Sequence, residues 1–135
     1  MDKKKKVISN QRWHNFKLFL LIFVSTIIFF RLIVSIIGNT SLYIFGTEFH
    51  HLFFGVILLM ITGFIRFFST NEKLNRLDLI LFGVGTGMVV DQFVYIIFTL
   101  GDHLSYFSAV SLYGAIVFSI MLVAMFYFLF RRIAD

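Results

Sequence analysis

Four apolar stretches, separated by short polar connections, constrain this sequence more than any other feature. They cover residues 18–37, 49–68, 77–100 and 105–130. A helix of about 20 apolar residues crosses the hydrocarbon core of a membrane. A small soluble core has no room for 20 phenylalanines or for a hydrophobic share of 59%. We therefore predict an all-α membrane protein in which a single domain, residues 18–130, contains four transmembrane helices.

The positions of lysine and arginine predict how these helices are oriented. Basic side chains occur in the N-terminal segment 1–17, in the second connection and in the C-terminal tail 131–135, but the first and third connections contain none. Loops rich in Lys and Arg stay on the cytoplasmic side. Short connections place successive helices antiparallel. The pattern predicts an up-down bundle with both termini in the cytoplasm, and the basic segment is expected to contact anionic lipid.

Composition also excludes several kinds of site. The chain contains no cysteine, which excludes disulfides, thiolate metal sites and cysteine nucleophiles. The net charge of +5 comes largely from the two ends of the chain. No basic globular surface is left once the four stretches are removed, so nucleic acid is not an expected partner.

The third stretch contains the residue that a membrane tolerates least. Gly83, Gly87, Asp91 and Tyr95 follow one another at intervals of four residues and therefore lie along one stripe of a helix. Glycines at this spacing allow a neighbouring helix to come close. A carboxylate at membrane depth costs on the order of 2.5–3.5 kcal/mol by insertion scales, which makes it a candidate functional site. We predict close helix packing at the two glycines and a polar site at Asp91.

Arg31 in the first stretch carries the charge that matches Asp91. Arg31 lies six residues, or about 9 Å, before the outer end of its stretch, and Asp91 lies nine residues, or about 13 Å, before the outer end of the third. Opposite charges at similar depth relieve each other's burial when they pair. Two interpretations stay open. The pair either fixes only how the helices pack, or forms a site in which Arg31 binds an anion or a lipid phosphate.

Histidines occur near the same end of the predicted bundle. His50 and His51 open the second stretch, and Asp102 and His103 lie in the third connection. Adjacent helical residues point about 100° apart, so only one of the first two histidines can face the centre. His51 shares a face with Gly55, where we predict helix packing, and is therefore expected to point inward. His50 is expected at the level of the lipid headgroups.

The residues His51, Asp91, Asp102 and His103 could together bind a divalent metal ion. Imidazole and carboxylate groups are suitable ligands for zinc, iron or manganese. The spacing matches no HExxH, ExxH or HxxxH signature. A bound metal would activate water near the outer leaflet, and a metal-free site would pass a proton between histidine and Asp91. In either case Asp91, His51 and His103 are the catalytic candidates.

The fourth stretch carries small residues at helical spacing. These are Ser108, Ser111, Ala115 and Ser119. Small and hydroxylated residues in this arrangement usually line a close helix contact, and we predict that role for them. No nucleophile-elbow motif surrounds Ser108.

Two motifs carry a resemblance to a known group of proteins. At HHLFFG (50–55) and GVGTGMVVDQF (83–93) the chain resembles small, uncharacterised bacterial membrane proteins with four spans. The matching residues are His50, His51, Gly55, Gly83, Gly85, Gly87, Asp91 and Phe93. Gln92 stands where the group has glutamate, and residues 102–107 match its acidic and aromatic outer turn. The resemblance implies a bacterial cytoplasmic membrane and supports the location of the site, but it brings no established activity.

The leading functional hypothesis is a polar site in the outer half of the bundle, built on arginine, histidine and aspartate. It would bind a metal ion, a lipid headgroup or a lipid-linked anion, with Arg31, Tyr95 and Tyr106 as ligand contacts, and an enzyme would act on a lipid substrate. The alternatives are a transport or pore protein that forms a homo-oligomer through its glycines, and a structural or accessory membrane subunit. The residues leave open whether the protein is an enzyme.

Overall fold

The structure is a computed structural model that describes residues 3–37, 42–44, 47–99 and 105–134. Its helices are α1 (Lys3–Ile37), α2 (His51–Phe68), α3 (Glu72–Thr99) and α4 (Ala109–Ala134), with two short strands, β1 (Leu42–Ile44) and β2 (Thr47–Phe49), before α2. Each of these four helices contains a stretch long and apolar enough to cross a membrane. The prediction of a helical protein with four such helices is confirmed.

The two strands form an antiparallel hairpin in the first connection, where the sequence was expected to form a loop. Tyr43 pairs with Glu48, and Leu42 pairs with Phe49. Aromatic and β-branched residues in both segments favour an extended backbone.

Side-chain caps determine where two of the helices begin. The Asn71 side-chain oxygen accepts the backbone N–H of Lys73 at 2.9 Å, at the start of α3. The Ser108 hydroxyl oxygen accepts the backbone N–H of Ser111 at 3.3 Å, at the start of α4. Such bonds satisfy N–H groups that the first helical turn leaves free. Because Ser108 is a cap, α4 begins at Ala109 instead of at residue 105.

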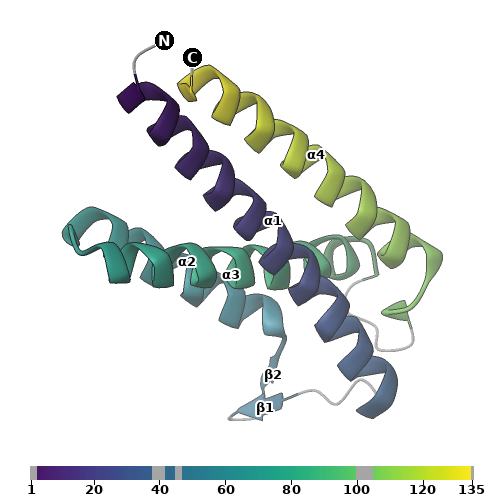
Figure 1. The fold of residues 1–135 in the computed structure, drawn as a ribbon. Coiled ribbons are helices and arrows are strands. Elements are labelled where there is room, and N and C mark those ends of the chain that lie inside the picture. Colours follow the sequence, from purple (N-terminus) through teal and green to yellow (C-terminus); the bar gives the residue numbers. More distant parts are fainter. Residues whose placement is uncertain (1–2, 38–41, 45–46, 100–104, 135) are drawn as a thin grey trace.

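Helix α3 occupies the centre of the molecule and packs against each of the other three helices. In the most apolar 18-residue segment of α3, 56% of the residues are buried, compared with 11% or less in the corresponding segments of α1, α2 and α4. In Figure 1, α2 and α3 form one antiparallel pair that crosses behind α1, and α1 and α4 form a second pair. A polar residue on α3 can therefore reach partners on all three other helices.

Helices α1 and α4 meet at the end of the molecule where the two chain termini lie (Figure 1). Their contact there is aromatic: the ring of Trp13 lies 4.9 Å from that of Phe130, and the ring of Phe16 stacks on Phe130 at 5.4 Å. Further along, Phe19 and Phe23 of α1 are buried against α3. Helix α1 thus packs on α4 near the termini and on α3 in the middle of the molecule.

Glycines allow α3 to approach two helices closely. A Cβ atom at Gly85 would lie 2.9 Å from the carbonyl oxygen of Gly55, and one at Gly55 would lie 2.8 Å from that of Gly85. On another face of α3, a Cβ at Gly83 or Gly87 would lie 2.9 or 2.8 Å from side chains of α1. All three glycines predicted to pack, and Gly85 beside them, therefore lie at close helix contacts.

The outward faces of the four helices carry large apolar side chains. Phe67 is 87% exposed and Ile36 is 81% exposed, and many similar residues surround the described part of the molecule. Exposure of so large an apolar surface to water is unfavourable, whereas its contact with lipid chains is not.

Candidate functional site

Asp91 is the centre of a polar cluster and is fully buried, with 0% of its side chain exposed. Its Oδ1 atom accepts a hydrogen bond from Nε of Arg31 at 2.7 Å. Its Oδ2 atom accepts one from the hydroxyl of Tyr106 and lies 3.1 Å from Nε2 of His51. Three side chains thus surround one carboxylate. Charge-assisted bonds of this kind offset much of the free energy that burial of the charge costs.

The four residues of the cluster come from α1, α2, α3 and the turn before α4. Arg31 lies on α1, His51 is the first residue of α2, Asp91 lies on α3, and Tyr106 lies in the turn before α4. The pairing of Arg31 with Asp91 and the inward position of His51 agree with the sequence analysis. The contact of the Tyr106 hydroxyl with Asp91 was not foreseen, because Tyr106 was expected only to contact a ligand.

Arg31 makes further contacts with the start of α4. Its Nη2 atom donates to the hydroxyl oxygen of Ser111 at 3.3 Å and lies 3.4 Å from the Ser111 carbonyl oxygen. Its guanidinium carbon lies 5.1 Å from the centre of the Tyr106 ring, within the range of a cation–π interaction. Its Nη1 atom is buried and has no hydrogen-bond partner in the described part of the chain. One end of the guanidinium group therefore keeps unused donors.

His51 is held by packing as well as by Asp91. Its ring stacks on that of Phe30 at 4.5 Å with an angle of 18° between the planes, and 14% of the side chain is exposed. An ionised carboxylate can only accept, so Nε2 of His51 is the donor in that contact. In the neutral ring Nδ1 is then an acceptor. The site thus combines a fixed imidazole with a partly exposed edge.

Two tyrosines and His50 pack beside the cluster. Tyr95 is 0% exposed, and its ring meets the rings of Tyr106 at 5.2 Å and His50 at 6.2 Å, each edge to face. Tyr106 is 1% exposed and lies outside the four helices that could span a membrane. Burial, followed by the nearby charge of Asp91 and the hydrogen bond to it, raises the pKa of the Tyr106 phenol. The phenol therefore remains a donor to the carboxylate at neutral pH.

Gln92 connects the site to the start of α2. Its side-chain oxygen accepts the backbone N–H of Leu52 at 2.8 Å, and Gln92 is 3% exposed. His50, the N-cap residue of α2, makes no side-chain capping bond. A residue of α3 therefore supplies the acceptor that the first turn of α2 needs. Through this bond α3 holds the helix end that carries His51.

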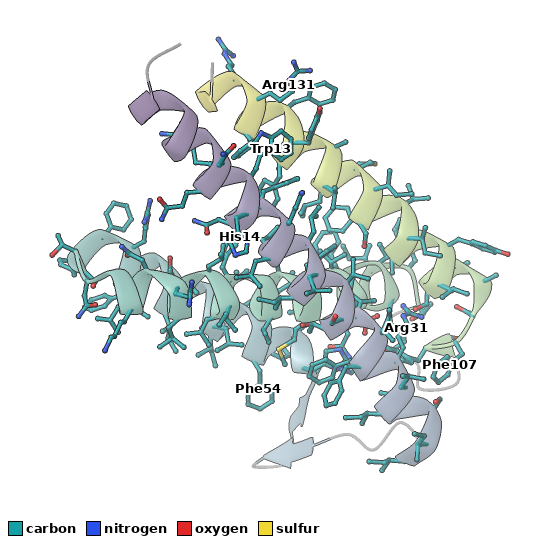
Figure 2. All side chains as sticks on the ribbon, viewed as in Figure 1. Trp13, His14, Arg31, Phe54, Phe107 and Arg131 are labelled. Atoms are coloured by element: carbon teal, nitrogen blue, oxygen red, sulfur yellow. The ribbon has the colours of Figure 1, made fainter. Side chains whose placement is uncertain are left out.

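A groove of about 500 Å³ lies between α1 and α4, next to the cluster. It extends along α1 from Phe23 to Ser35, a distance of about 18 Å at 1.5 Å per residue. Arg31, near the outer end of this range, is the one charged side chain among the described residues that line the groove. Almost all of the remaining lining is apolar, and Ile116 is one example. Figure 2 shows Arg31 and Phe107 near the end at which α4 begins.

The predicted metal ligands are only partly described by the structure. His51 and Asp91 are in contact, whereas Asp102 and His103 lie outside the described residues. Within residues 3–37, 42–44, 47–99 and 105–134, no three His, Cys, Asp or Glu side chains form a group that could bind a metal ion. Zinc, iron or manganese at this site therefore stays a prediction.

Two polar contacts of the site were missed at the level of sequence. Ser111 was expected only to pack, yet it is fully buried and accepts from Arg31. Its place one turn after Ser108, on the first turn of α4, was the signal that could have placed it near the outer end. Gln92 was noted only as a departure from glutamate. The sequence carried no signal for its contact, because adjacent helical residues point about 100° apart and a buried Asp91 says nothing about the side chain of its neighbour.

Comparison of the chain with models of protein families, with curated proteins and with solved structures finds no match.

Proposed function

We propose that the four helices cross a bacterial cytoplasmic membrane in up-down order, with both termini in the cytoplasm and the Asp91 cluster in the outer half. The distribution of Lys and Arg supports this orientation, and so does the position of both termini at one end (Figure 1). The chain has no cysteine, so single cysteines can be labelled without a background. An impermeant reagent should label Asp102→Cys but not Lys73→Cys in intact cells. The reverse pattern would overturn the orientation.

We also propose that the protein binds the anionic headgroup of a membrane lipid or a lipid-linked anion at Arg31. The observation that carries this proposal is the groove between α1 and α4, in which a single charged side chain, Arg31, accompanies a nearly continuous apolar lining. Its length of about 18 Å is close to the thickness of one leaflet, about 15 Å, which is half of the hydrocarbon core. An acyl chain matches the apolar lining, and an anion matches the arginine.

The hydrogen bonds of Arg31 support the same ligand. Asp91 and Ser111 occupy Nε and Nη2, and Nη1 has no partner among the described residues. A buried neutral donor without an acceptor destabilises the folded protein by about 1–3 kcal/mol, and a charged donor destabilises it by more. A phosphate or carboxylate oxygen at this end of Arg31 would supply that acceptor.

A reaction on the bound lipid is the next hypothesis to test. The Asp91–His51 contact leaves Nδ1 of a neutral His51 as a proton acceptor at the edge of the site. Hydrolysis or transfer on a lipid substrate is the class of reaction that such a base would serve. Elemental analysis of the purified protein, beside His51→Ala and Asp91→Asn, decides whether a metal ion takes part.

Lipid binding by the purified protein tests the proposed groove. Ile116 lines the groove and is 47% exposed, whereas its neighbour Val117 does not line it and is 55% exposed. Ile116→Trp should fill part of the groove and weaken binding of phosphatidylglycerol at least about tenfold, equivalent to 1.4 kcal/mol. Val117→Trp, which adds the same ring outside the groove, should bind like the wild type. Native mass spectrometry measures both.

Two results would contradict the proposal. Equal affinity for phosphatidylglycerol and for diacylglycerol, which has the same acyl chains but no phosphate, would show that Arg31 does not bind the headgroup. An equal loss of lipid affinity in Ile116→Trp and Val117→Trp would show that the lipid does not bind in the groove. Either result would favour a purely structural role for the ion pair.

A further inference from the structure

A second cavity, lined mostly by polar residues, lies far along α1 from the Asp91 cluster, toward the chain termini. Its volume is about 710 Å³, and its lining comes from α1, from the last turn of α2 and from the beginning of α3. Ten described residues line it, and only Leu18 and Leu79 among them are apolar. Figure 2 shows His14 on the part of α1 that faces the α2–α3 pair. No residue of the Asp91 cluster lines this cavity.

Positive charge dominates the lining. Arg66, Lys73 and Arg76 contribute three cationic side chains, and Asp78 is the one acidic residue among the described residues that line the cavity. Arg66 lies in the last turn of α2, and the other two lie in the first turns of α3. These groups come from the two sides of one short connection and line the same cavity, and the charge of Arg66 also acts on Asp78. An anion in the cavity would be attracted by all three cations.

The cavity also contains acceptors that lack donors. Oδ1 of Asn75 and Oδ1 of Asp78 are buried and have no hydrogen-bond partner within the described part of the chain. Buried oxygen atoms of this kind are normally satisfied by protein, by water or by a ligand. The two residues are three positions apart on α3 and therefore lie on neighbouring positions of one helix face. The cavity thus presents donors on its basic side and acceptors on one face of α3.

We infer that this cavity binds a phosphate ester whose alcohol part carries hydrogen-bond donors. The phosphate would lie between Arg66, Lys73 and Arg76, and a hydroxyl or ammonium group would donate to Asn75 and Asp78. Glycerol phosphate and phosphoethanolamine both have this chemistry, either as soluble molecules or as the headgroups of phospholipids. Basic pockets between membrane helices on the cytoplasmic side are typical sites for phospholipid headgroups. This inference does not depend on the groove at Arg31.

Calorimetric titration of the purified full chain in detergent micelles tests the phosphate side. Glycerol 3-phosphate and phosphoethanolamine should bind to the wild type. Arg76→Gln and Lys73→Gln, both at exposed side chains, should each weaken binding about tenfold through the loss of one charge-assisted bond. Arg132→Gln removes the same charge at the end of α4, outside the cavity, and should leave the affinity unchanged.

The acceptor side has a separate test. Asn75→Ala should weaken binding of the two esters but not of inorganic phosphate, because phosphate alone does not reach the acceptors on α3. Ile116→Trp in the other groove should change neither affinity, which separates this site from the one at Arg31.

The source of the ligand follows from the same titration in lipid nanodiscs. If phosphatidylethanolamine nanodiscs abolish binding of soluble phosphoethanolamine, the site takes the headgroup of a lipid, and undiminished binding assigns it to a soluble ester. Both outcomes support a phosphate ester. The inference is wrong if the wild type binds none of these compounds, or if Arg132→Gln loses as much affinity as Arg76→Gln.

Discussion

Gly55 of α2 and Gly85 of α3 face each other so closely that a Cβ on either would lie within 3 Å of the other's carbonyl oxygen. This crossing sets the geometry of the candidate site. His51 lies four residues before Gly55, and Asp91 lies six residues after Gly85, which correspond to about 6 and 9 Å along the two helices. Because α2 and α3 are antiparallel, both residues lie on the same side of the crossing. Any side chain at the crossing would separate the histidine from the carboxylate.

Substitution of these glycines should therefore damage both packing and the site. Gly85→Ala and Gly55→Ala each place a methyl group against a rigid backbone oxygen and should destabilise the protein by about 1–3 kcal/mol, as overpacking does. Gly63 of α2 is the matched control, since a Cβ there would meet nothing within 4 Å. Gly63→Ala should be neutral or stabilise by about 0.5–1 kcal/mol, because alanine favours a helix. Unfolding in mixed detergent micelles measures these changes, and equal effects at all three positions would contradict the close crossing.

The Arg31–Asp91 pair should be far more sensitive to the loss of one partner than to the loss of both charges. Asp91→Asn keeps one acceptor oxygen, which Tyr106 and His51 can share, but leaves the guanidinium charge uncompensated, which should cost about 3–5 kcal/mol. The double variant Arg31→Met with Asp91→Asn should recover part of that loss. A double variant no more stable than Asp91→Asn alone would show that the charges do not interact.

Exchange of the two charges should fail to restore stability. In the native protein the Tyr106 hydroxyl donates a hydrogen bond to Asp91. In Arg31→Asp with Asp91→Arg, the new arginine would therefore place its donors against that donor, and the new aspartate would face Ser111. The four-residue cluster is not symmetric, so the exchange leaves donors without acceptors. Full recovery of stability in the exchanged protein would mean that the ion pair acts alone.

The Tyr106 hydroxyl should contribute measurably to stability. Tyr106→Phe removes one hydrogen bond to the buried carboxylate and should cost about 1.5–3 kcal/mol, as bonds to charged groups do. Tyr113→Phe on α4 removes a hydroxyl from a side chain that is 64% exposed and should have almost no effect. The comparison uses the free energy of unfolding of the two variants.

The same substitution should alter how stability depends on pH. The raised pKa of Tyr106 means that its contribution is fully present below the unfolded value of about 10 and is lost as pH rises through the higher folded value. The wild type should therefore lose its advantage over Tyr106→Phe only in strongly alkaline solution. A difference that disappears near neutral pH would contradict this assignment.

Gln92 should stabilise the first turn of α2 through its oxygen. Gln92→Ala removes the acceptor of the Leu52 N–H and should cost about 1 kcal/mol, the usual effect of a lost helix cap. Gln92→Glu keeps an acceptor at the same position and should preserve the bond. Hydrogen exchange of the Leu52 amide should accelerate in the alanine variant and not in the glutamate variant. Equal exchange rates in both would assign the cap to another group.

Several features of the site could be predicted because they depend only on residue type and on position within a single helix. The charges of Arg31 and Asp91, and their depths in two apolar stretches, indicated a pair before any packing was known. The helical period placed His51 on the face of Gly55. The choice of His51 over His50 as the inward residue followed from this period and from the predicted helix packing at Gly55, and the contact of His51 with Asp91 agrees with it.

Other features depended on contacts that the sequence does not specify. The role of Gln92 follows from the end of α2 lying beside the middle of α3, and the role of Ser111 follows from the start of α4 lying beside Arg31. The hairpin before α2 was treated as a loop, because segments of three residues are too short for a periodic pattern.

The sequence by itself determined that the described part of the chain contains four helices able to span a membrane and that Arg31 and Asp91 carry opposite charges at similar depth, because apolar length and charge are properties of single segments. Only the tertiary structure decided that α3 is the central helix and that a groove separates α1 from α4 beside Arg31. The distances at which helices pack depend on which side chains face each other, and small residues such as Gly55 and Gly85 act only through that contact.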